Sequence, residues 1–178
     1  MKRKILPVLL AVWPYMIMIP GLFEGKAASI LLYLYGPLTI AVYAWNIINA
    51  FKYEGEHADR ELAFYNMLIK LIHIPFYLGV FILGVMFLLA SVVPALIFFT
   101  PMVLIYLIFS DMILLVVSSM YGVNAIRKAN RCGILTGKST VRNLIMHFIF
   151  VCDVISAIHI YYKIRKEEIS WKEKTNGE

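Results

Sequence analysis

Long apolar runs separated by short polar segments dominate this chain. An α-helix rises about 1.5 Å per residue, so about 20 apolar residues cross a hydrocarbon core of about 30 Å. The pattern therefore predicts an all-α fold, namely a polytopic integral membrane helix bundle with about five transmembrane helices in a single transmembrane domain, residues 1–178. The predicted spans are residues 5–23, 27–51, 64–93, 96–121 and 144–162.

The composition also indicates that most of the protein surface faces lipid. The chain is 61% hydrophobic and 16% charged, whereas soluble domains average about 25% charged residues. The net charge of +6 comes from Lys and Arg at the ends of apolar runs. This distribution is typical of positive-inside orientation and of contact with anionic headgroups, not of nucleic acid binding. We therefore expect a multi-pass protein of the cell membrane, with the lipid bilayer as its main partner.

Basic residues set the expected orientation. The N-terminal MKRK and the basic loop 127–142 fall on one side of the five predicted spans, which the positive-inside rule assigns to the cytoplasm. The charged tail, residues 163–178, then falls outside and breaks the rule. Four spans plus a re-entrant or interfacial segment bring the tail inside. We nevertheless prefer five spans, because polar positions on the last apolar run point in three directions about 120° apart, as in a helix surrounded by other helices.

The first apolar run has two interpretations. A basic start, an apolar stretch and a later pair of small residues, Gly25 and Ala27, resemble a cleaved signal peptide. However, residues 5–23 are longer than the usual apolar region of such a peptide, and they contain Trp13, Tyr15 and three prolines. We expect a retained first helix.

The clearest candidate site lies inside the membrane. Asp111 and Asp153 fall near the middle of their predicted spans, where an isolated charge costs about 2.5–3.5 kcal/mol on insertion scales. Two carboxylates at one depth can share a proton, which is the chemistry of a proton- or cation-coupled site. The alternative is that each is protonated and hydrogen-bonded to a neighbour, and only holds helices together. The candidate intramembrane residues are Asp111, Asp153, His147, His159 and Ser110.

A second candidate site lies at the inner face. Asn66, Lys70 and His73 recur at three- and four-residue spacing, so they share one helix face. They can line a cavity mouth or bind headgroups, and we expect Lys70 to extend to the interface as lysines near span ends do. Residues 62–73 are expected to lie along the interface, with the helix bending inward at Pro75.

Other motifs give weaker signals. The acidic residues and His57 in the loop 54–61 offer ligands for a hard cation, but we expect a solvated connection and no metal. The segment 133–139 (GILTGKS) has three residues between its glycines, whereas a nucleotide-binding P-loop needs four. Cys132 and Cys152 are not expected to pair. We predict no cofactor and no catalytic residue.

Three functions fit this pattern. The first is a small proton- or cation-linked transporter or channel, or a subunit of one. The second is a non-catalytic accessory protein that packs against a larger membrane partner, and the third is an enzyme acting on lipids at the inner face. A homo-oligomer or a larger membrane complex is compatible with each.

Overall fold

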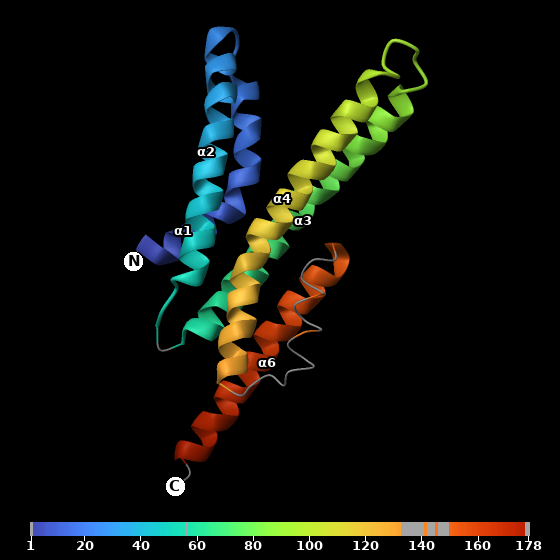
Figure 1. The fold of residues 1–178 in the computed structure, drawn as a ribbon. Helices are drawn as coiled ribbons and strands as arrows, with labels where there is room; N and C mark the ends of the chain where they lie inside the picture. The colour runs from blue at the N-terminus through green and yellow to red at the C-terminus, as the bar shows by residue number, and fades with distance from the viewer. Residues whose placement is uncertain (1, 56, 133–140, 142–144, 146–149, 177–178) are drawn as a thin grey trace.

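The computed structural model describes residues 2–55, 57–132, 141, 145 and 150–176, and all its regular elements are helices (Figure 1). Among these described residues, four segments are long and apolar enough to cross a membrane: Lys4–Leu22, Lys26–Phe51, Ala58–Ala90 and Phe99–Arg131. The prediction of an all-α membrane helix bundle is therefore confirmed. The helices are α1 (Lys2–Val12), the 3₁₀ helix η1 (Trp13–Leu22), α2 (Lys26–Phe51), α3 (Ala58–Ala90), α4 (Phe99–Arg131) and α6 (Phe150–Asn176).

The first hairpin joins α1 and η1 to α2. Pro14 and Pro20 lack the backbone N–H groups of a regular α-helix, and this part of the chain is wound as a 3₁₀ helix. The indole of Trp13 donates a hydrogen bond to Thr39 Oγ1 at 2.9 Å and stacks on Tyr35 with ring centroids 5.8 Å apart. These contacts fix η1 against α2, so the first apolar run packs into the bundle.

The second hairpin consists of α3 and α4, which diverge from the first hairpin toward the upper end in Figure 1. α3 is one helix from Ala58 to Ala90 and includes Pro75. Leu62, Asn66 and Ile69 are buried in its first third. The expectation that residues 62–73 lie along the interface is therefore wrong, because this segment is the first part of a long helix packed inside the bundle.

The last helix, α6, packs against α3 and also touches α4. Asp153 near its start pairs with Lys70, whereas Tyr161 two turns later contacts Phe64, nearer the start of α3. α6 thus runs antiparallel to α3, and the C-terminal end of α6 lies beyond the end of α4 (Figure 1). The predicted fifth span, 144–162, starts in residues outside the described part. The choice between five spans and four spans with a re-entrant segment therefore stays a prediction.

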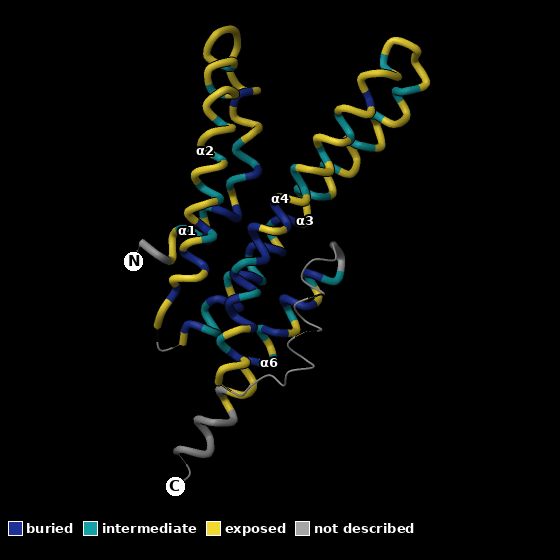
Figure 2. Tube along the Cα trace, in the orientation of Figure 1, coloured by how far each residue is buried: buried dark blue, intermediate teal, exposed yellow. Residues whose placement is uncertain are grey.

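Burial is concentrated where the helices meet. In Figure 2 the buried residues gather in the lower part of the bundle, and the arms of both hairpins are mostly exposed. The exposed residues there include large apolar side chains such as Phe98, Met102 and Phe109. Such a surface is compatible with lipid rather than water as its solvent.

Candidate functional site

Lys70 on α3 is one of the largest fully buried side chains of the protein. It is about three turns inside the helix, and its side chain is 1% exposed. Its ammonium nitrogen donates hydrogen bonds to Ser118 Oγ at 2.7 Å and Ser119 Oγ at 2.9 Å, and the carbonyl oxygen of Leu115 lies 3.4 Å away. The expectation that Lys70 extends to the interface is therefore wrong. The Lys70 side chain extends to α4 inside the bundle, and not to water.

The fourth partner of Lys70 comes from α6. Asp153 Oδ2 forms an ion pair with the Lys70 ammonium group, and the Asp153 side chain is also 1% exposed. The two charges compensate each other in a buried region, where either one alone is costly. Four oxygen atoms from two helices, one from Asp153 and three from α4, thus surround one ammonium group.

This arrangement joins the two predicted sites in part. Lys70 of the inner-face group pairs with Asp153 of the intramembrane group. One hypothesis brought Asp153 close to Asp111, and the structure places the Asp153 carboxylate against Lys70. The rest of the inner-face group does share the predicted face of α3, because Asn66 and His73 are also buried.

His73 and Asn66 extend this polar face along α3. His73 Nε2 donates to the carbonyl oxygen of Leu10 at 3.3 Å, which connects α3 to α1. Its Nδ1 atom and the Asn66 Oδ1 atom have no hydrogen-bond partner among the described residues. The polar face therefore contacts three other helices, α1, α4 and α6.

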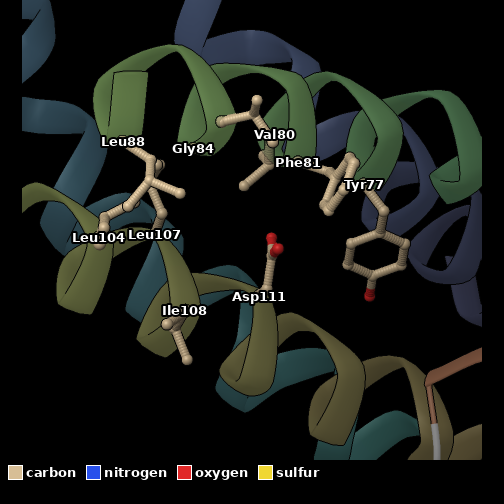
Figure 3. A pocket seen from close by; sticks show the side chains of 10 residues that line it. Tyr77, Val80, Phe81, Gly84, Leu88, Leu104, Leu107, Ile108 and Asp111 are labelled. Atoms are coloured by element: carbon tan, nitrogen blue, oxygen red, sulfur yellow. The ribbon is translucent and has the colours of Figure 1, made fainter. Parts of the chain in front are cut away.

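Asp111 lies elsewhere, on the wall of a pocket between α3 and α4 (Figure 3). The pocket has a volume of about 290 Å³, and its lining residues are apolar apart from Asp111 and Tyr77. Asp111 Oδ1 has no hydrogen-bond partner within the described part of the chain. Ser110, its neighbour on α4, is half-buried.

The two histidines of the intramembrane group do not join this site. His159 is exposed on α6, although Asp153 on the same helix is buried. His147 lies outside the described residues. The described residues thus do not support a proton relay along the last helix.

A second polar contact joins α2 to α4. Tyr121 donates its hydroxyl proton to Asn46 Oδ1 at 2.8 Å and accepts from Asn49 Nδ2 at 3.1 Å. Asn124, one turn later, donates to the carbonyl oxygen of Ala50. All four side chains are buried, so this seam fixes α2 against α4 without a net charge.

A third polar cluster lies where the loop between α2 and α3 meets α1 and the first turn of α3. Glu61 forms an ion pair with Lys4 and accepts a hydrogen bond from the Tyr53 hydroxyl. Burial raises the pKa of Tyr53, and the hydrogen bond to Glu61 raises it further. Lys70 does not join this cluster, since its ammonium group contacts α4 and α6. The described residues hold no group of three or more His, Cys, Asp or Glu side chains arranged for a metal ion.

The serine pair on α4 was not predicted as part of the site. Ser118 and Ser119 are consecutive hydroxyls within an apolar run, and both donate to the carbonyl oxygen of Leu115 while accepting from Lys70. Two adjacent hydroxyls in a predicted span were the available signal, because polar side chains inside a membrane need partners.

Fold and site together define a class: an all-α membrane-type helix bundle with a charge pair buried between α3 and α6. The chain belongs to the family described as "Family of unknown function (DUF6652)", whose model matches residues 5–166. No curated protein matches the chain, and neither does any solved structure.

Proposed function

We propose that the protein is a small proton- or cation-linked transporter or channel, or a subunit of one, and that Lys70 and Asp153 form its ion site. The observation that carries this proposal is the oxygen cage around the Lys70 ammonium group. Ionisable residues inside membrane proteins commonly mark ion pathways and proton relays. Carboxylate, hydroxyl and carbonyl oxygens are also the ligands that hard cations prefer.

The ammonium group of Lys70 is in effect a cation tethered to α3. A free cation that reaches the cage competes with Lys70 for Asp153, Ser118 and Ser119. A proton delivered to Asp153 removes one of the two charges that hold α6 against α3. Either event weakens the contact between α6 and α3, which couples occupancy of the site to helix movement.

The test is ion flux in liposomes that contain the purified full-length protein. An internal pH-sensitive dye reports proton entry under an imposed K⁺ diffusion potential, and a Na⁺-sensitive dye reports Na⁺ entry. We expect flux that depends on the wild-type protein and is lost in Lys70→Met and in Asp153→Asn. Lys26→Met and Glu24→Gln, which change exposed residues of the same types, are the matched controls and should keep the flux.

Loss of folding must be separated from loss of function. Each variant is therefore checked by gel filtration in detergent, and the reversed pair Lys70→Asp with Asp153→Lys is included. Reversal retains the attraction between α3 and α6 but moves the ammonium group away from the serine hydroxyls. We expect the reversed pair to fold without conducting. Absence of flux in the wild type, or full flux in both single variants, contradicts the proposal.

A second candidate is a non-catalytic accessory protein that packs against a larger membrane partner. The observation in its favour is that Lys70 and Asp153 are each 1% exposed, as expected for a static clamp that docks α6. Under this alternative the wild type gives no ion flux. The single variants lose assembly with the membrane partner, and the reversed pair restores it. The enzyme alternative has less support, because Lys70 is directed away from the loop 54–61.

We also propose that the end of the bundle with Lys4, the loop 52–57 and Arg131 faces the cytoplasm. The contact of Lys4 with Glu61 brings the N-terminus to this end. With the tail on the same side, nearly all Lys and Arg residues outside the membrane in the described part of the chain are there, and Lys26 is on the other side. This is the charge distribution of the positive-inside rule, with anionic headgroups as partners.

A further inference from the structure

The pocket between α3 and α4 is separate from the Lys70–Asp153 site. Asp111 lies about two turns, or about 10 Å, before Ser118 on α4. From Asp111 the pocket extends along α4 to Leu104 and along α3 from Tyr77 to Leu88. Several of its lining residues are exposed on the arm of the hairpin, including Phe81 and Ile108. The pocket therefore opens to the surface that we assign to lipid.

The carboxylate of Asp111 points into this pocket (Figure 3). Apolar side chains from both helices surround it, and its Oδ1 atom has no hydrogen-bond partner among the described residues. A carboxylate at membrane depth is costly unless a positive or donating group meets it. The pocket thus combines apolar walls with one strong acceptor that the described protein residues leave unsatisfied.

We propose that this pocket binds an amphiphilic amine, with the ammonium group at Asp111 and an apolar chain between α3 and α4. Charge complementarity selects this ligand class. An uncharged lipid chain leaves the Asp111 oxygen without a partner, and an anionic lipid is repelled by it. The volume of about 290 Å³ is at the small end of the range for ligand pockets, which suits a single short chain. The proposal does not depend on the ion site.

The test uses radiolabelled decylamine and the full-length protein in phosphatidylcholine nanodiscs, with empty nanodiscs as the background. Decanol, which has the same chain and no charge, is the matched probe. We expect saturable binding of decylamine to the wild type and weakening by about tenfold or more in Asp111→Asn, since hydrogen bonds to charged groups are worth that much. Decanol should bind weakly to both. Glu24→Gln removes an exposed carboxylate and should leave decylamine binding unchanged.

A second variant tests the pocket without changing the charge. A Cβ at Gly84 meets only Leu104 Cδ2, at 3.7 Å, so a side chain there is accommodated at its base and extends into the pocket. Gly84→Leu should abolish decylamine binding, and gel filtration should show a folded protein. Equal decylamine affinity in the wild type and in Asp111→Asn overturns the proposal. A dimer that Gly84→Leu dissociates also overturns it, because a second copy then fills the groove.

Discussion

The ammonium group of Lys70 on α3 and the carboxylate of Asp153 on α6 form an ion pair in which both side chains are 1% exposed. α6 differs from the other long helices, because it is not among the described segments apolar enough to cross a membrane on its own. Apolar side chains of α6 such as Ile160 and Ile164 pack in the core. Asp153 adds a charged contact near the N-terminal end of this helix. The pair is therefore a buried polar link between the last helix and the bundle.

Removal of one member of this pair should be strongly destabilising. Lys70→Met leaves Asp153 buried and unpaired, which typically costs about 3–5 kcal/mol in the free energy of unfolding. The double variant Lys70→Met with Asp153→Leu removes both charges, and it should recover most of that loss. Unfolding by SDS in mixed micelles measures both. A double variant as unstable as the single one contradicts the claim that the unpaired charge is the cause.

Part of this arrangement follows from the sequence alone. The spacing of Asn66, Lys70 and His73 places them on one helix face, and in the structure all three side chains are buried. The position of Asp153 on an apolar run also indicates that it faces protein. Helical periodicity, however, fixes which side chains share a face and not which helix that face meets. The pairing of α3 with α6 depends on tertiary packing, which helical periodicity does not determine.

The position at which α3 begins explains why the prediction for Lys70 was wrong. The apolar pattern begins at Leu62, so Lys70 looked close to a span end, within reach of headgroups. α3 instead begins at Ala58, and polar residues in its first turn, including Asp59 and Glu61, belong to the helix. This extension moves Lys70 into the bundle. The apolar arms, by contrast, were predictable because hydrophobic length alone determines them.

Tyr121 should contribute to stability through its two amide partners. Tyr121→Phe removes the hydroxyl between Asn46 and Asn49 and leaves buried amide groups with fewer partners. We expect a loss of about 1–3 kcal/mol in the free energy of unfolding. Tyr33→Phe makes the same chemical change at a side chain that is 82% exposed, and it should stay within about 0.5 kcal/mol of the wild type. Equal losses in the free energy of unfolding for the two variants contradict a stabilising role of the Tyr121 hydrogen bonds between α2 and α4.

Gly25 should tolerate no side chain without strain. Its backbone has φ 66° and ψ −140° at the start of α2, a conformation that L-residues rarely adopt. Gly25→Ala should therefore destabilise the protein by about 1–3 kcal/mol. The matched variant is Gly55→Ala, because an added Cβ meets open space at both positions and only Gly25 has positive φ. Similar unfolding midpoints for these two variants show that the turn adapts to a side chain.

The direction of α6 predicts that the charged tail emerges on the same side as the loop 52–57. In a variant that lacks Cys132 and Cys152, single cysteines are placed at Gly55 and Lys166 on the predicted inner side. Matching cysteines are placed at Glu24 and Val92 on the opposite side; all four positions are exposed. An impermeant maleimide should label Glu24→Cys and Val92→Cys in intact cells, and the other two only after permeabilisation. Labelling of Lys166→Cys in intact cells, with Gly55→Cys protected, means that the last segment crosses the membrane. Five spans are then correct, and Asp153 must meet Lys70 from a helix that continues to the other side.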